Sequence, residues 1–131
     1  MRIFLSLILF INFTFASVIK IIVTGDIMTH KPQLDYAKNS SGFDFSPQFS
    51  NIKEFLKSAD LVIGNFESSS NPNLIYKGYP LFNTPAEIFK ALKDAGFHAL
   101  STANNHALDG GIDGVLTTRS EEHTSELQSR T

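Results

Sequence analysis

Apolar residues along the chain gather in β-branched runs and in stripes with helical spacing. Residues 18–24 are almost continuously apolar and end at Gly25 and Asp26, which is typical of a strand covered on both faces. Residues 60–67 form a second short apolar run and residues 97–102 a third. These runs predict three strands.

Two stretches between the predicted strands have the spacing of amphipathic helices. The first is expected to start with Ser46 as N-cap and Pro47 at the first helical position. The second is expected to start with a capping box over residues 84–87 and to end at Gly96. Their apolar stripes are Phe49, Ile52, Phe55 and Leu56 in the first helix, and Ile88, Phe89, Leu92 and Ala95 in the second.

Strands and helices therefore alternate along the chain, which predicts an α/β fold with parallel strands and right-handed crossovers. Residues 38–45 and 68–80 are rich in serine, asparagine, glycine or proline and are expected to be loops. The second of these loops is expected to expose Tyr76 and Tyr79.

Residues 1–16 have the layout of a secretory signal peptide. Arg2 precedes an apolar run over residues 3–11, and residues 14–16 have the small-x-small pattern of a cleavage site. The alternative is an uncleaved membrane anchor, but the stretch between Arg2 and Lys20 is marginal against the roughly 20 apolar residues that a span needs. We expect an exported protein, periplasmic or at the cell surface.

Residues 119–131 have neither a strand period nor a helix period, and Leu127 is their only large apolar residue. The segment resembles the conceptual translation of a common sequencing-library adapter. On that interpretation it is not native, the natural reading frame is left near Thr118, and the chain is a truncated fragment. A disordered polar tail is the plainer alternative. In both cases the domain is expected to span residues 17–118, and His123 receives no functional role.

Composition narrows the classes of function. Eleven Lys and Arg stand against 13 Asp and Glu, a balance that provides no electrostatic footprint for nucleic acid. The chain contains no cysteine, which excludes disulfides, thiolate nucleophiles and cysteine-ligated metal sites. An exported domain of this kind must be held together by its core or by metal.

Each predicted strand ends in polar side chains. Asp26 follows the first strand and Glu67 closes the second, while Asn105 and His106 follow the third. Because the carboxyl ends of parallel strands lie at one edge of a sheet, we expect these side chains to share one cleft. Carboxylates, an amide oxygen and an imidazole are ligands that Mg²⁺, Mn²⁺, Zn²⁺ or Fe²⁺ accept, and a pair of such ions can activate water.

Three motifs at these strand ends resemble the CapA family of bacterial capsule-synthesis proteins, which is associated with poly-γ-glutamate capsules. They are GDIM at 25–28, GNFE at 64–67 and ANNHALDGG at 103–111, of which the third is the most specific. The resemblance runs from about Val18 to Thr118. It implies the N-terminal half of a metallophosphatase-like, calcineurin-like phosphoesterase fold, an incomplete βαβαβ sandwich with parallel strands.

The resemblance also implies a role for each matched residue. Asp26 would bind one divalent metal ion, and Glu67 would stand where the superfamily has a carboxylate able to bridge two ions. Asn105 would offer its amide oxygen to the second ion. His106 would act as general acid or as hydrogen-bond donor to the leaving oxygen. The ions would be Mn, Fe, Zn or Mg, and the substrate an anionic polymer or a phosphoester.

Some positions depart from the patterns of these families. Phe66 stands where CapA-like sequences usually have leucine, and Gly110 where they have an aromatic residue. Met28 replaces a histidine of typical metallophosphoesterases, as CapA-like sequences prefer, and His30 is balanced between a surface role and a site role. The remaining histidine ligands of the superfamily come later than this sequence extends. We therefore expect an incomplete dinuclear site and little or no phosphodiesterase activity from residues 17–118.

Several of these residues also have plainer explanations. Asp26 could cap a turn and Glu67 could be a solvated loop charge, although their place beside similar strand ends favours the ligand role. Asn104 is expected to shape its loop, and Asp109 with the two glycines after it to fix the turn of the motif. His98 is expected to be a structural histidine with one hydrogen-bonded nitrogen.

Three hypotheses for function follow. The leading one is an exported CapA-like protein that acts in the synthesis, export or processing of a capsular polymer such as poly-γ-glutamate, with membrane-associated capsule machinery as partner. The second is a metal-dependent hydrolase of phosphoesters or polymer linkages. The third is a non-catalytic binding module of the envelope.

The incomplete sheet has a consequence for solubility. Half of a sandwich leaves an unpaired strand edge and one uncovered face. We expect poor solubility or a molten state for residues 17–118, and two-state thermal unfolding would contradict this.

Overall fold

The computed structural model describes residues 17–127, with side chains described up to residue 123, so the predicted signal peptide lies outside the described residues. Three parallel strands form a sheet in the order β1-β4-β5. They are β1 (Ile21–Ile27), β4 (Leu61–Phe66) and β5 (Ala99–Ser101). The predicted α/β fold with an incomplete parallel sheet is therefore confirmed.

Only one face of β1 is packed, so the prediction that this strand is covered on both faces is wrong. Ile22 pairs in register with Val62 and packs with it on the covered face. Ile21 and Val23 point to the opposite face and are 55% and 72% exposed. The reason is that β1 lies at the edge of the sheet and the described helices pack on a single face of it.

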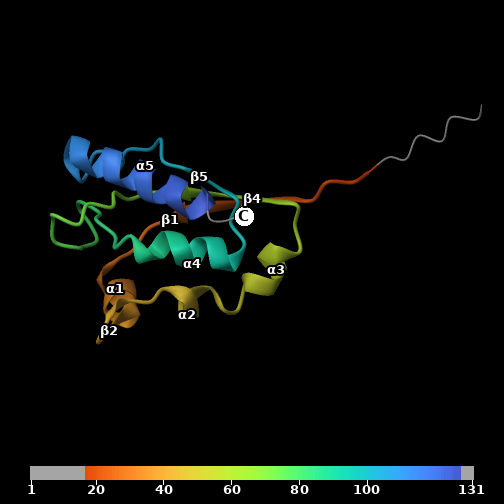
Figure 1. Cartoon of the computed structure of the whole chain (residues 1–131), viewed down its shortest axis with the longest axis horizontal. Helices are drawn as coiled ribbons and strands as arrows, with labels where there is room; N and C mark the ends of the chain where they lie inside the picture. Colours follow the sequence, from red (N-terminus) through yellow and green to blue (C-terminus); the bar gives the residue numbers. More distant parts are fainter. Residues whose placement is uncertain (1–16, 128–131) are drawn as a thin grey trace, which may run out of the picture.

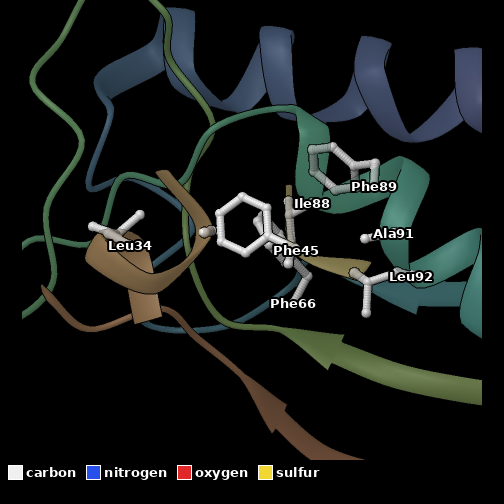
Figure 2. Packing of buried hydrophobic residues seen from close by; sticks show 8 residues of the cluster. Leu34, Phe45, Phe66, Ile88, Phe89, Ala91 and Leu92 are labelled. Atoms are coloured by element: carbon white, nitrogen blue, oxygen red, sulfur yellow. The ribbon is translucent and has the colours of Figure 1, made fainter. Parts of the chain in front are cut away.

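That face is covered by α4 (Glu87–Ala95). Helix α4 lies between α5 (Gly111–Leu127) and the short helices α2 (Ser46–Phe49) and α3 (Lys53–Lys57) (Figure 1). The predicted apolar stripe is buried, and Gly96 ends the helix with a left-handed φ of 112°. Figure 2 shows Phe66 of β4 and Phe45, which precedes α2, beside Ile88 of α4, while Leu34 of α1 (Lys31–Ala37) lies farther out in the same buried cluster. The rings of Phe66 and Phe89 lie 4.8 Å apart at the centre of this core.

The predicted capping box at residues 84–87 does not form. Helix α4 begins only at Glu87, and no side chain caps its N-terminus. Thr84 is fully buried, and its hydroxyl is hydrogen-bonded to the hydroxyls of Thr29 and Ser68 at 2.6 and 2.8 Å. A tertiary hydrogen-bond network therefore takes the hydroxyl that the local pattern had assigned to a cap.

The helix predicted from Ser46 is divided into α2 (Ser46–Phe49) and α3 (Lys53–Lys57). Ser46 is the first helical residue rather than the N-cap, and its backbone N–H donates to Asp44 Oδ1 at 2.9 Å. Of the predicted stripe, only Leu56 is buried, whereas Ile52 and Phe55 are exposed. Serine and asparagine at positions 50 and 51 are weak helix formers, which favours the break.

Residues 31–43 form structure that the sequence pattern did not indicate. Helix α1 (Lys31–Ala37) has proline in its first turn and buries Leu34 and Ala37. A short antiparallel hairpin follows, formed by β2 (Lys38–Asn39) and β3 (Gly42–Phe43), where a loop was predicted. Strands of two residues are too short to leave a period in the sequence.

Helix α5 continues through the first part of the segment set apart at residues 119–131, so a disordered polar tail is wrong as far as Leu127. Its first turns are anchored by Thr118, whose hydroxyl accepts from Ser70 N at 2.8 Å and donates to Gly114 O at 2.6 Å. No helix in the part of the chain that the structure describes has the length and hydropathy to cross a bilayer.

The loop predicted at residues 68–80 is present and continues to residue 83, but much of it is buried. Ser68, Ser69, Ser70 and Asn71 are each at most 4% exposed, and the side chain of Asn83 donates to Asn71 O. No buried polar side-chain atom in the described part of the chain lacks a hydrogen-bond partner. Tyr79 is exposed, as expected, whereas Tyr76 is half-buried. The loop therefore contributes buried, hydrogen-bonded side chains to the interior of the domain.

Candidate functional site

A bulge in β1 turns Asp26 toward the candidate site. Val23 pairs with Ile63 and Asp26 with Asn65, so β1 contains one more residue than β4 between these two pairs. Side chains alternate between the two faces of a strand, and one inserted residue reverses the alternation. Asp26 thereby lies on the same face as Asn65 instead of facing α4.

Asn65 connects the two carboxylates that were predicted as ligands. Its side-chain amide donates to Asp26 Oδ1 at 2.8 Å and to Glu67 Oε2 at 3.3 Å. The backbone N–H of Glu67 donates to Ile27 O at 3.0 Å, which extends the β1–β4 pairing past the end of the strand. The structure thus brings Asp26 and Glu67 together at one edge of the sheet.

The loop after β5 adds the residues of the third motif. The side-chain amide of Asn104 donates to Asn65 Oδ1 at 3.1 Å and to Phe66 O at 2.9 Å. Its own Oδ1 accepts from the backbone N–H of His106 at 3.0 Å. Asn104 is therefore a loop-shaping residue, as predicted, and it fixes the position of His106 against β4.

The imidazole of His106 lies between two carboxylates. Its Nδ1 is 2.7 Å from Asp109 Oδ2, and its Nε2 is 3.8 Å from Glu67 Oε1. The side chains of these three residues are 17%, 8% and 12% exposed respectively. The ring of Phe82 packs edge-on against the imidazole, with centroids 4.7 Å apart. The contact with Asp109 fixes the ring so that Nε2 faces Glu67, at a distance longer than a hydrogen bond.

The environment of Glu67 disfavours its charge. Burial raises the pKa of the Glu67 carboxyl above its ordinary value, and a hydrogen bond with Asp26 and repulsion from that carboxylate raise the pKa further. The charge of His106 and a hydrogen bond from Asn105 act in the opposite direction. Asp26, Asn105 and His106 are therefore each close enough to Glu67 to influence its charge.

This donor set fits part of a divalent-cation site. A cation would relieve the repulsion between Asp26 and Glu67, and the oxygens of these residues and of Asn105 are hard ligands. Among the described residues, no three histidine or carboxylate side chains are grouped so that they could hold a metal ion by themselves. Further ligands would be needed to complete such a site.

Two residues of the candidate site, Asn65 and Asp109, were not predicted as site residues from the sequence. Asn65 was recognised only as a polar strand end within GNFE, yet it contacts Asp26, Glu67 and Asn104. Asp109 was assigned to a turn, yet its carboxylate accepts from Phe82 N at 2.6 Å and contacts His106. The spacing of three residues between His106 and Asp109 was the available signal for this pair.

Two further histidines, His98 and His30, have other partners. His98 is structural, as predicted: its Nδ1 accepts from Val62 N at 3.0 Å and its backbone N–H donates to Val62 O at 2.9 Å. His30 is exposed at the N-terminus of α1, where its ring packs edge-on against Phe82 at 5.0 Å. His30 and His106 thus contact the same phenylalanine ring.

Comparison with known proteins shows which family the chain belongs to. The family model described as bacterial capsule synthesis protein PGA_cap matches residues 20–129. The chain belongs to this family. The match includes all three motifs and most of the segment set apart at residues 119–131, whose adapter interpretation stays a prediction.

Several relatives of this PGA_cap chain are known by name. It is 34% identical over 103 residues to the PGA biosynthesis protein CapA of Bacillus subtilis (strain 168), which covers 74% of the chain and 26% of the relative. It is 34% identical over 102 residues to the capsule biosynthesis protein CapA of Bacillus anthracis, covering 73% and 24%. The Sinorhizobium fredii (strain NBRC 101917 / NGR234) protein y4sH is 38% identical over 80 residues, covering 55% and 17%. The chain thus spans about a quarter or less of these relatives.

Proposed function

We propose that this protein acts in the synthesis, export or processing of a capsular polymer such as poly-γ-glutamate, and that Asp26, Glu67 and Asn105 hold part of a divalent-metal site beside His106. The observation that carries the proposal is the convergence of these side chains at the carboxyl ends of three parallel strands. The capsule proteins named above, whose sequences align with this chain, support the polymer as the target.

The chain's own residues would have distinct tasks in such a site. Asp26 and Glu67 would hold Mn, Fe, Zn or Mg, with Asn105 as an oxygen ligand, and the ion when bound would polarise an oxygen of the substrate. Asn65 orients both carboxylates through its amide group. Asp109 orients His106, whose Nε2 would exchange a proton with the leaving oxygen.

Two functions are compatible with such a site, hydrolysis and binding without catalysis. In the first the site hydrolyses a phosphoester or a polymer linkage, and the half-buried imidazole of His106 between two carboxylates favours this version. In the second the protein is a non-catalytic binding module of the envelope. We further propose export directed by residues 1–16, with a membrane-anchored form as the alternative and membrane-associated capsule machinery as partner.

Metal binding is tested directly on the chain. After treatment with a chelator, Mn²⁺, Zn²⁺ or Mg²⁺ is added, and the metal content and melting temperature are measured for the parent chain and for Glu67→Gln. We expect the parent to bind metal and to melt at a higher temperature with it, and Glu67→Gln to lose most of this response. Glu54→Gln, on the exposed side of α3, is the matched control. An equal metal response in Glu67→Gln would contradict the metal site.

Function is tested by complementation of a capsule-deficient strain with the complete gene. We expect Glu67→Ala and His106→Ala to abolish polymer production, while Glu54→Ala restores it. Polymer production by both site variants at the parent level would support the binding module and refute the hydrolase. Immunoblotting for the protein separates loss of function from loss of protein.

A further inference from the structure

A cavity of about 420 Å³ lies outside the cluster just described. It is formed by α1, by the β2–β3 hairpin and by residues 76–79 of the buried loop, and none of the predicted metal or catalytic residues lines it. Its volume is within the range of sites for small ligands or for a segment of a longer one.

The walls of the cavity are positively charged. Lys31, Lys38 and Lys77 line it, and Asp35 is the only carboxylate in its lining, although the whole chain carries a net charge of −2. Lys31 is paired with Asp35 at 2.7 Å. Within the described part of the chain, Lys38 and Lys77 have no ion-pair partner. Two unpaired ammonium groups beside one concavity attract anions.

An aromatic wall gives the cavity a defined shape. Tyr76 packs edge-on against Phe43 at 5.6 Å, and Phe43 stacks at 6.2 Å on Phe45, which is fully buried. Burial, with smaller effects from Glu87 and Glu121, raises the pKa of the Tyr76 phenol, so its hydroxyl stays protonated and can donate a hydrogen bond. Neither glutamate lines the cavity.

The same loop joins this cavity to the candidate site. Lys77, Gly78 and Tyr79 line the cavity, and Phe82, three residues after Tyr79, packs against His106. Three residues of extended chain span at most about 11 Å. A ligand with several residues or monomers can therefore occupy the cavity while another part of it reaches His106.

We propose that this cavity is a polyanion subsite, which holds an anionic group of the polymer, a carboxylate or a phosphate, through Lys38 and Lys77. The identity of the polymer rests on the proposed function, but anion binding by the cavity does not. The subsite would secure the polymer beside the metal site and would set which part of it faces His106.

The test measures binding by the full chain in the presence of a chelator, so that metal does not contribute. A fluorescent decamer of glutamic acid and a fluorescent polyphosphate are the two anionic probes, and neutral dextran is the uncharged one. We expect one or both anions to bind, with affinity that falls as salt is raised, and dextran not to bind. Tighter binding of the decamer assigns the subsite to carboxylates, and tighter binding of polyphosphate assigns it to phosphates.

The decisive variant is Lys38→Gln with Lys77→Gln, both exposed positions. We expect about tenfold weaker binding of the preferred anion, and parent-like binding by Lys53→Gln, a control on α3. Circular dichroism checks that the variants are folded. Unchanged affinity in the double variant, an equal loss in the control, or no anion binding by the parent would each overturn the subsite.

One further variant separates this proposal from the proposed function. His106→Ala is expected to bind the anionic probe as the parent does, because the imidazole is not part of the cavity. A parent chain that binds the anionic probe but shows no metal response would refute the metal site and leave the subsite standing. The reverse result would refute the subsite alone.

Discussion

At the scale of single residues, three carboxylates lie close to the imidazole of His106 and to the side-chain amides of asparagines. Asn65 partly offsets the repulsion between Asp26 and Glu67 by donating to both. His106 contacts the third carboxylate, Asp109, directly and lies 3.8 Å from Glu67. The arrangement has more negative than positive charge without a cation, which leads to two predictions.

The first concerns Glu67 and pH. The pKa of Glu67 is raised in the folded chain, so its contribution to stability is fully present below the pKa of the unfolded chain and is lost as pH rises through the folded value. With a chelator present, we expect Glu67→Gln to melt at a higher temperature than the parent at neutral pH. This advantage should vanish below about pH 4, where the parent carboxyl is protonated in both states.

Thermal melting followed by circular dichroism between about pH 3 and 8 measures this difference. Glu54→Gln serves as control, because Glu54 is exposed on α3. A difference between Glu67→Gln and the parent that is the same at every pH would show that the carboxyl charge is not its cause.

The second prediction concerns the stability contributed by Asp109. One of its oxygens contacts both His106 Nδ1 and the backbone N–H of Phe82, in a side chain that is 8% exposed. We expect Asp109→Asn to lower the free energy of unfolding by about 1–3 kcal/mol, because the neutral amide is a weaker acceptor for both donors. Urea denaturation measures this loss. Asp113→Asn, an exposed change in the first turn of α5, should cost about 1 kcal/mol or less, and equal losses would contradict the prediction.

At the scale of elements, one buried loop packs closely against a helix. The loop over residues 68–71 lies against the start of α5, where Thr118 and Gly114 contact it. A Cβ at Gly110 would lie 2.6 Å from Ser69 Oγ and 3.0 Å from the Cα of Gly114. This close approach explains why glycine stands where an aromatic residue was expected from the family pattern.

We therefore expect Gly110→Ala to destabilise the chain by about 1–3 kcal/mol, since the new methyl group has no space without a shift of the loop or of α5. Chemical denaturation checks this value. Gly25→Ala is the matched control, because a Cβ at Gly25 meets no atom within 4 Å. A Gly110→Ala variant as stable as the Gly25→Ala variant would show that the loop and α5 are not tightly packed.

At the scale of the whole molecule, the described helices cover one face of the sheet and leave apolar residues of β1 exposed on the other. Ile21 and Val23 lie on the uncovered face of β1, which is also an edge of the sheet. Exposed apolar surface next to unpaired backbone groups favours association between chains. The matched residues span about a quarter of the CapA relatives, which agrees with a sheet that is only partly built.

We expect the parent chain to self-associate, and Ile21→Lys with Val23→Lys to shift it toward the monomer, because two charges on the face oppose stacking. Sedimentation velocity over a range of concentrations measures the shift. Tyr36→Lys is the control, since Tyr36 is equally exposed but lies on α1. A monomeric parent chain that unfolds in a single two-state transition would contradict this prediction.

The sequence by itself determined the three strands, the buried stripe of α4 and the polar strand ends, because β-branched runs, helical spacing and Gly96 act through local backbone preferences. It also placed Asp26 and Glu67 at one sheet edge, since parallel strands end together. The tertiary structure alone decided which face Asp26 occupies, what Thr84 bonds and that Asn65 links two carboxylates. Those outcomes depend on a bulge and on contacts between residues distant in the chain, and such contacts leave no period in the sequence.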